Sequence, residues 1–247
     1  MNPSIPYLSI IIPLYNAASY IGFAIESIYR QEFASLGEPF EILIVNDGST
    51  DGSDVIARQL ATKHSEIQLI EQENHGVASA RNAGIRQSRG EIICFMDADD
   101  EYPDGTLVFF VEELNLLRQQ FGELVMVRGL TQHVRRDESG EDWCMSGEPI
   151  DLSVVHANAQ TRAAVEKAGF FDEELANSED IDWLLRAEAA GVVMSARQRV
   201  TLLYRRHETN MTRNASDILH HKLKMFKKHL DRERNRRASE EGLEIQS

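Results

Sequence analysis

The chain has 247 residues, a formal net charge of -14 at pH 7 and 42% hydrophobic residues. This length and composition fit one large α/β domain with an appended tail, and they argue against a second full domain. An acidic protein is a poor binder of nucleic acid, because that affinity rests on cations that neutralise phosphates. Nucleic acid is therefore not expected as a partner.

Membrane spans and export signals are not expected either. The longest clearly apolar stretch near the N-terminus covers only Leu8 to Leu14 and lacks a basic flank, whereas a spanning helix needs about 20 apolar residues. The sequence therefore predicts a cytoplasmic protein. Its two cysteines, Cys94 and Cys144, have no metal-ligand spacing and indicate no disulfide framework.

The first hundred residues alternate between two patterns. Apolar runs predict strands, and apolar residues at helical spacing predict helices, in the order strand 8–12, helix 21–28, strand 40–45, helix 55–60, strand 67–70, helix 77–85 and strand 91–96. Such alternation predicts a Rossmann-like, mostly parallel central sheet with helices on both faces. Ligands of such a sheet lie at the carboxyl ends of its strands.

Beyond residue 100 the pattern loosens. It predicts a helix over 107–117, a strand over 124–134, a loop over 147–158, a helix from 181 to 189 and two short strands at 192–196 and 200–204. We expect residues 1–212 to form the domain and 213–247 to form a basic helical tail with a disordered end.

Three carboxylates follow the strand at 91–96, in the run Asp97-Ala98-Asp99-Asp100. Carboxylates gathered at a strand end repel one another unless a cation joins them, and such oxygen clusters suit Mg²⁺ or Mn²⁺ that carries substrate phosphates. The alternative is an Asp-rich turn that caps the next helix. The sequence has no glycine-rich phosphate loop, so a bound diphosphate would depend on a cation and positive side chains, which favours the metal interpretation.

Four sequence blocks, taken in order, resemble the inverting family 2 glycosyltransferases of the GT-A fold. They are SIIIPLYN at 9–16, IVNDGSTD at 44–51, GVASARNAG at 76–84 with DADD at 97–100, and ED at 179–180 with RRH at 205–207. The similarity covers roughly residues 8 to 212. Each block is weak alone, but their order and spacing together are specific.

The resemblance implies a nucleotide-sugar site formed by Pro13, Tyr15, Asp47, Arg81, Asp97 and Ala98. Tyr15 offers a ring for base stacking, and Asp47 offers a carboxylate that can accept the imide N–H of uracil. Asp47 could instead form only an Asx-turn, and Arg81 could be a solvated charge on its helix.

The resemblance also implies that Asp99, Asp97 and His207 bind Mn²⁺ or Mg²⁺ and that Asp180 is the catalytic base. Each of these assignments has a simpler alternative. A carboxylate in the first turn of a helix complements the helix dipole without any further role. His207 could be an exposed loop histidine beside two arginines.

These features predict a metal-dependent, inverting glycosyltransferase that uses a nucleotide-diphosphate sugar, with UDP-sugar favoured, and a glycan or lipid-linked acceptor in cell-surface polysaccharide synthesis. The Gln-x-x-Arg-Trp block of the processive synthases is absent, so transfer of one sugar per encounter is expected. The alternatives are a sugar nucleotidyltransferase, which would release pyrophosphate, and a catalytically silent binding module.

The tail differs from the acidic body in charge. Between Arg213 and Arg237 it carries nine Lys/Arg and three acidic residues. Leu219, Leu223, Phe226 and Leu230 form one apolar stripe on a helix. This pattern predicts contact with anionic lipid on the inner face of the membrane; the alternative is a helix packed on the domain or on a dimer partner.

Overall fold

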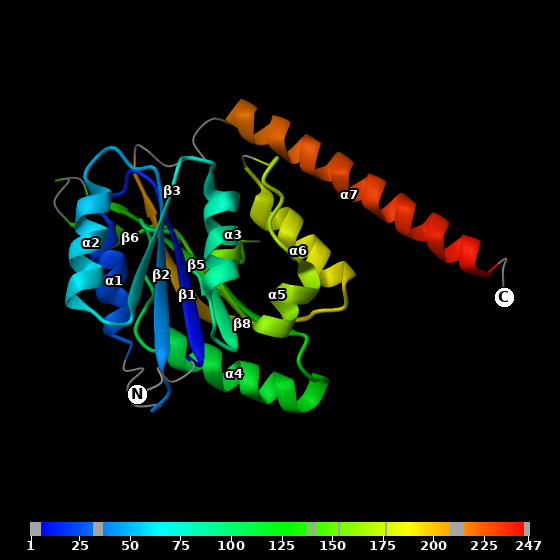
Figure 1. Ribbon diagram of the computed structural model, residues 1–247, viewed down its shortest axis with the longest axis horizontal. Helices are drawn as coiled ribbons and strands as arrows, with labels where there is room; N and C mark the ends of the chain where they lie inside the picture. The colour runs from blue at the N-terminus through cyan, green and yellow to red at the C-terminus, as the bar shows by residue number, and fades with distance from the viewer. Residues whose placement is uncertain are drawn as a thin grey trace.

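The computed structural model describes residues 6–31, 37–137, 139, 142–152, 154–175, 177–207 and 215–244, and in the last helix it describes side chains at 221–235. Figure 1 shows a central sheet covered by helices, with a long C-terminal helix that projects from one side. None of the helices in the described part of the chain combines the length and the apolar character that crossing a bilayer requires.

The first half of the sheet is parallel, as the alternation predicts. Its elements are β1 (Leu8–Leu14), α1 (Ile21–Tyr29), β2 (Phe40–Asp47), α2 (Ser53–Lys63), β3 (Ile67–Gln72), α3 (Val77–Gln87) and β4 (Ile92–Phe95). The strands lie in the order β3-β2-β1-β4, and every neighbouring pair is parallel. β1 is buried along nearly all its length, which explains why its run is apolar apart from Ser9.

The second half of the sheet is mixed. Its elements are α4 (Thr106–Phe121), β5 (Val125–Arg136), β6 (Trp143–Met145), the 3-10 turn η2 (Val155–Ala157), β7 (Asn158–Thr161), α5 (Arg162–Ala168), α6 (Glu179–Ala189), β8 (Val193–Arg206) and α7 (Ala215–Glu244). β7 runs antiparallel to both β4 and β5, whereas β8 is parallel to β5. The α/β class and the C-terminal helix are confirmed, and parallel pairing predominates only in the first half.

Two expectations for the second half are wrong. The segment 147–158 is not wholly loop, because it contains η2 and the start of β7. β8 is one strand rather than two short ones; polar and exposed residues interrupt its apolar pattern without breaking it, and its pairing with β5 shifts register around Leu130. Such a shift bends a strand without ending it.

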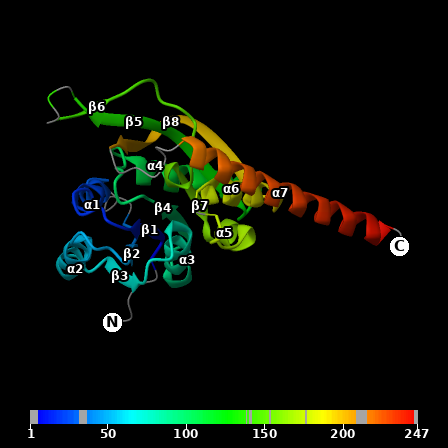
Figure 2. The ribbon, with the colours of Figure 1, turned by 90° about the horizontal axis from the view of Figure 1, so that it is seen from above.

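Helices cover both faces of the sheet. Figure 2 shows α1, α2 and α4 on one face and α3, α5 and α6 on the other, matching two apolar clusters of the core. α3 approaches β1 so closely that a Cβ built on Gly84 would lie 2.3 Å from Cγ2 of Ile11. Both cysteines are free: Cys94 is buried in β4, whereas Cys144 is exposed on β6.

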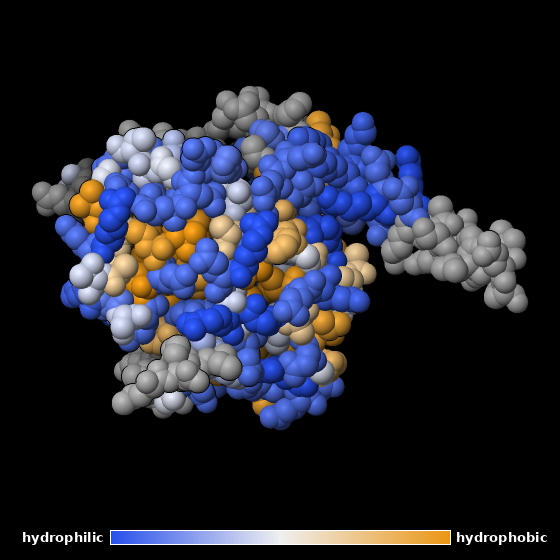
Figure 3. All heavy atoms as spheres, viewed as in Figure 1, coloured by the Kyte–Doolittle hydropathy of each residue, from blue (hydrophilic) through white to orange (hydrophobic). Residues whose placement is uncertain are grey.

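α7 packs against α6 and then continues away from the body, as both ribbon views show. The face of α7 turned toward the viewer in Figure 3 is mostly hydrophilic. The side chain of Leu219, residues 208–214 and residues 245–247 lie outside the described residues, so the expectation of a disordered end is not tested. The sequence left packing on the domain as an alternative to contact with lipid. One face of α7 does pack on the domain.

Candidate active site at the carboxyl edge of the sheet

The carboxyl ends of four strands meet at one edge of the sheet. β1, β2 and β4 are parallel, and β8 points the same way, because β7 is antiparallel to both β4 and β5. Tyr15, Asp47, Asp97 and His207 each end or follow one of these strands. The fold therefore gathers at one edge residues that are up to 192 positions apart.

Asp97 is the first carboxylate after β4, and it has two partners. Nη2 of the buried Arg81 donates to its Oδ1 at 2.9 Å, and Nδ1 of His156 lies 3.2 Å from its Oδ2. Burial alone would raise the pKa of Asp97, but His156 and Arg81 outweigh that effect and hold the pKa below its usual value. Asp97 is therefore ionised, and it remains partly accessible.

Asp99 pairs with the histidine at the end of β8. Nε2 of His207 lies 2.9 Å from Oδ2 of Asp99. The imidazole ring also stacks on Tyr20, with ring centroids 4.4 Å apart. The structure thus brings together the two residues Asp99 and His207, which the sequence separates by 108 positions.

Asp100 is fully buried and faces the protein interior. Its Oδ1 accepts the backbone N–H of Arg205 at 3.0 Å, whereas its Oδ2 has no hydrogen bond and lies 3.7 Å from Nε2 of His156. Burial, together with the charges of Asp99 and Asp97, raises the pKa of Asp100 well above its usual value. Asp100 therefore differs from Asp97 and Asp99, because its environment favours the protonated form.

His156 is a site residue that the sequence did not reveal. It lies in η2, where its ring is buried between Asp97 and Asp100, and burial lowers its pKa. The neighbouring segment is weakly patterned, so it gave only a loop prediction. The one local signal for an inward-facing His156 is that it stands between two apolar residues, Val155 and Ala157. Both of these neighbours are fully buried in the structure.

Arg81 connects the carboxylate loop to the start of α6. Its Nη1 donates to Oε1 of Glu179 at 2.6 Å while its Nη2 binds Asp97. Only 3% of the Arg81 side chain is exposed, so both contacts form in a largely desolvated setting. Its predicted role in binding the nucleotide sugar stays a prediction, and the geometry adds a structural link between Asp97 and Glu179.

Asp180 follows Glu179 in the first turn of α6. Its Oδ1 accepts the N–H of Ile181 at 2.8 Å. Burial and then the nearby charge of Glu179 raise the pKa of Asp180 to about 7, against the opposing effect of Arg81. A carboxylate with such a pKa can exchange a proton near neutral pH, which is what a general base requires.

The predicted nucleotide pocket contains one exposed ring and one buried carboxylate. Tyr15 is 52% exposed, so its ring is available for stacking. Asp47 is buried, and it accepts bonds from Nε2 of Gln72 at 2.7 Å and from the N–H groups of His75 and Gly76 at 2.9 Å.

The other predicted pocket residues lie close by in the chain. Pro13 is partly buried in β1, beside Tyr15, and Ala98 is buried between Asp97 and Asp99. The assignments of Pro13 and Ala98 to the nucleotide-sugar site stay predictions.

The donor set at this edge suits a hard divalent ion. Asp97, Asp100 and His156 offer ligand atoms that all lie within 4.8 Å of one another, and three of their polar atoms are buried without a hydrogen bond: Oδ2 of Asp100 and both ring nitrogens of His156. Asp99 and His207 add a second carboxylate–imidazole pair. Mn²⁺ accepts this mixture of oxygen and nitrogen donors, so the residues fit the predicted ion.

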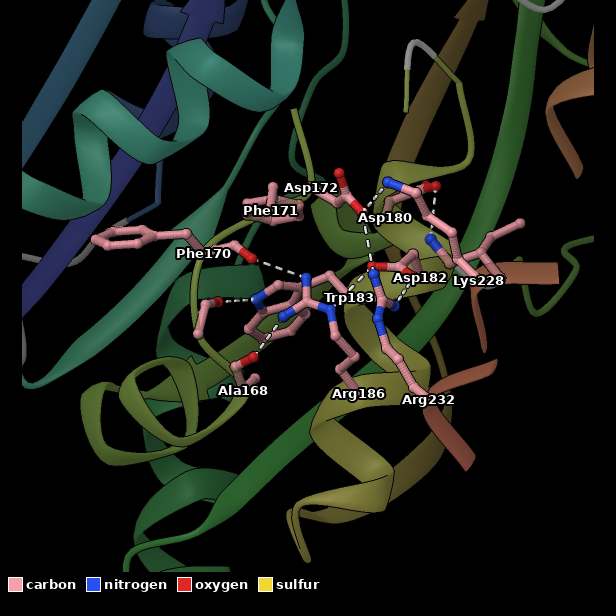
Figure 4. A network of polar contacts seen from close by, with 12 residues as sticks. Ala168, Phe170, Phe171, Asp172, Asp180, Asp182, Trp183, Arg186, Lys228 and Arg232 are labelled. Carbon is pink, nitrogen blue, oxygen red and sulfur yellow. Dashed lines mark hydrogen bonds and ion pairs between the residues drawn. The ribbon is translucent and has the colours of Figure 1, made fainter. Parts of the chain in front are cut away.

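Basic residues of α7 hold the start of α6 from outside (Figure 4). Nζ of Lys228 lies 2.8 Å from Oδ2 of Asp172, and Arg232 contacts both Asp172 and Asp182. Asp182 also binds Arg186 within α6 at 2.9 Å. We call Lys228, Arg232, Asp172 and Asp182 the α7 clamp. The clamp reaches α6 two residues after Asp180.

Sequence comparison links this chain to known proteins, most strongly through its first half. Residues 9–120 match the family model described as Glycosyl transferase family 2. The glycosyltransferase EpsJ of Bacillus subtilis (strain 168) is 44% identical over 96 residues, which is 39% of this chain and 27% of EpsJ. A glycosyltransferase of Rickettsia typhi is 29% identical over 232 residues, covering 88% of this chain and 70% of that protein. The chain spans only about a quarter of EpsJ.

Structural comparison agrees at the level of the fold. S. aureus TarS in complex with UDP-GlcNAc superposes with a TM-score of 0.67 at 18% identity, over 87% of this chain and 64% of that chain. The mannosyltransferase PcManGT of Pyrobaculum calidifontis, in complex with GDP-Man and Mn²⁺, also gives 0.67, at 21% identity over 92% of this chain and 64% of that chain.

Proposed function

Because the chain belongs to glycosyltransferase family 2, we propose that it transfers a sugar from a nucleotide-diphosphate sugar to a hydroxyl group of a glycan or lipid-linked acceptor, with inversion at the anomeric carbon. The single observation that carries this proposal is the contact chain Asp97–Arg81–Glu179. It joins the predicted donor-binding loop to the helix turn that holds Asp180.

The donor would bind across the first half of the sheet. Tyr15 would stack on the base, and Asp47 would accept an N–H group from the base edge. Only one of the three bonds to Asp47 goes to Oδ2, and a carboxylate offers about four acceptor positions, so acceptor capacity remains. This chemistry suits the imide of uracil, and UDP-GlcNAc in TarS supports the same class of donor.

A divalent ion would be held by Asp97 and Asp99 with His207, and His156 and Asp100 offer further ligand atoms next to Asp97. Such an ion offsets the charge of a diphosphate as it leaves. The Mn²⁺ in PcManGT supports this proposal. Arg81 would keep Asp97 ionised and correctly oriented, because it approaches the carboxylate from the buried side.

Asp180 would take the proton of the acceptor hydroxyl. As the acceptor oxygen bonds to the anomeric carbon, the bond from that carbon to the diphosphate breaks, and the electron pair leaves with the diphosphate. Attack from the face opposite the leaving group inverts the configuration. A pKa of about 7 places Asp180 where it can accept this proton at neutral pH.

A thermal-shift screen tests the donor site. UDP, GDP and dTDP would each be added with and without Mn²⁺; a ligand at 100 times its Kd stabilises the fold by about 2.7 kcal/mol. We expect the largest shift with UDP and Mn²⁺. Asp99→Ala should lose the Mn²⁺-dependent part of the shift and most turnover, whereas Asp104→Ala, at a side chain that is 82% exposed, should lose neither.

Two results would contradict the proposal. An unchanged Mn²⁺-dependent shift in Asp99→Ala would show that the ion has other ligands. Release of pyrophosphate instead of a nucleoside diphosphate during turnover would identify a nucleotidyltransferase.

A further inference from the structure

The two faces of α7 have opposite environments. One face is docked on the body: Met225 is fully buried, and Lys224 donates to the carbonyl of Glu174 at 2.7 Å. Lys228 and Arg232 of the α7 clamp lie on the same face. Four residues within three helical turns, Met225, Lys224, Lys228 and Arg232, fix the rotation of the helix about its own axis, so the opposite face must point outward.

The outward face carries an apolar stripe. Leu223, Phe226 and Leu230 are 61%, 50% and 57% exposed. Their spacing of i, i+3 and i+7 places them on one side of the helix. Three large apolar side chains that all face outward along a docked helix form a surface that is suited to a partner.

Cations flank this stripe. Lys222, Lys227 and Arg234 are exposed and lie beside it around the helix, and Nη1 of Arg234 lies 4.0 Å from Oδ1 of Asp231. The whole chain has a net charge of -14. An anionic surface would therefore repel most of the body and attract the outward face of α7. We propose that this face, defined by Leu223, Phe226 and Leu230 with Lys222, Lys227 and Arg234, binds the surface of an anionic lipid bilayer.

The charge pattern favours lipid over a second copy of the chain. Two copies that met through their stripes would bring the same three cations of each helix close together, and like charges in contact destabilise an interface. Anionic headgroups neutralise these cations while the acyl region takes up the apolar side chains. This arrangement describes a helix lying in the interface, which is consistent with the absence of a spanning helix among the described residues.

Docking of α7 would also set the orientation of the enzyme. α7 begins at the same end of the molecule as α6 and the carboxyl edge of the sheet (Figure 1). A bilayer bound along α7 would thus lie near the candidate site, where a lipid-linked acceptor could reach it. Lipid binding itself does not depend on the proposed activity, so each can fail without the other.

Vesicle co-sedimentation of the full chain tests the inference. Vesicles of phosphatidylcholine alone would be compared with vesicles that also contain phosphatidylglycerol. We expect binding only to the second kind and weaker binding at high salt. The variant K222Q/K227Q/R234Q should bind roughly a hundredfold more weakly, because each cation near an anionic surface contributes about fivefold.

The stripe has a matched control elsewhere on the molecule. L223S/F226S/L230S should lower binding by more than about tenfold. L116S/F121S replaces two residues of α4 that are 59% and 49% exposed, and it should bind as the unmodified chain does. Circular dichroism would show that each variant is folded.

Three outcomes would overturn the inference. One is the absence of binding to the anionic vesicles, and another is an equal loss of binding in the α4 control. The third is a dimer in sedimentation velocity that L223S/F226S/L230S converts to monomer while vesicle binding is unchanged, which would assign the stripe to a second copy.

Discussion

The two halves of the sheet hold their candidate site residues by different means. In the first half, Asp47 is held by its near surroundings, since Gln72 and the backbone of His75 and Gly76 follow on the next strand and its loop. In the second half, the helix that carries Asp180 is held by ion pairs from remote segments. Arg81 lies 98 positions from its partner Glu179, and the α7 clamp spans at least 50 positions.

This difference predicts that the two halves of the sheet contribute differently to stability and to turnover. Backbone N–H groups that are fixed by secondary structure pre-organise a carboxylate without side-chain entropy costs, whereas long-range ion pairs must order two flexible side chains. Changes in the first half should therefore alter stability and donor binding. Changes in the second half should alter turnover more than stability.

The largest effect is expected for Asp180→Asn. The amide keeps the oxygen that accepts the N–H of Ile181, but it cannot take a proton, and loss of a positioned base costs about 10²–10⁴ in rate. Transfer to the acceptor should fall at least about a hundredfold, with near-normal UDP affinity and melting temperature. More than roughly a tenth of normal turnover, when chemistry limits the rate, would show that another carboxylate is the base, and Glu179 and Asp182 would be tested next.

The same Asp→Asn change in the first half, at Asp47, should lower stability, whereas the change at Asp180 should lower turnover. In Asp47→Asn the new NH₂ group must face one of the N–H donors that now bind the carboxylate, and an unsatisfied buried donor costs about 1–3 kcal/mol. Each kcal/mol lowers the melting temperature of a chain of this size by about 2–4 °C. Thermal denaturation of both variants side by side measures this; an equal loss in the two would remove the distinction between the halves.

The pH dependence of transfer should follow Asp180. Its pKa of about 7 means that the base is protonated at lower pH, so kcat/KM should fall about tenfold per pH unit below about 7 and level off above it. Because the folded-state pKa lies above the unfolded one, the protonated group favours the folded state, and this contribution is lost as pH rises through about 7.

Glu179→Gln provides a check on this profile. The charge of Glu179 helps to raise the pKa of Asp180, so its removal should shift the profile toward acid pH. A profile that does not move would show that another group titrates.

The smallest effect is expected for the α7 clamp. Arg232→Ala removes contacts to Asp172 and Asp182, and the Asp182 side chain is only 1% exposed. We expect a loss of about 1 kcal/mol in stability and a severalfold lower kcat, with little change in UDP affinity. Lys167→Ala, at an exposed residue of α5, is the control, and Arg232→Lys should restore part of the loss. Equal behaviour of the two alanine variants would show that the clamp does not position α6.

The first half was predictable because its signals are local. Each strand is an apolar run, each helix has its own periodicity, and Tyr15, Asp47 and Asp97 follow strands that can be located without knowledge of the fold. β7 was not predictable in this way. Three of its four residues, Asn158, Gln160 and Thr161, are polar, yet every residue in it is buried, and β4 and β5 flank it on both sides.

The partners of the site residues were harder to foresee than the residues themselves. The contact between Arg81 and Glu179 depends on where the fold places the start of α6 relative to α3, which no local pattern encodes. The pairing of Asp99 with His207 depends on the direction of β8, and that direction follows from the antiparallel insertion of β7. The resemblance named these residues, whereas only the fold shows which of them touch.

The placement of the two thiols provides a kinetic probe of the sheet. Cys144 is exposed on β6, whereas Cys94 is inaccessible at the centre of β4, where burial raises the pKa of its thiol. A thiol reagent should therefore modify Cys144 at once and Cys94 only when the strand transiently opens. Cys94 lies three residues before Asp97. The rate of its slow labelling would therefore report how often β4 opens next to the candidate site, and a bound donor should lower that rate.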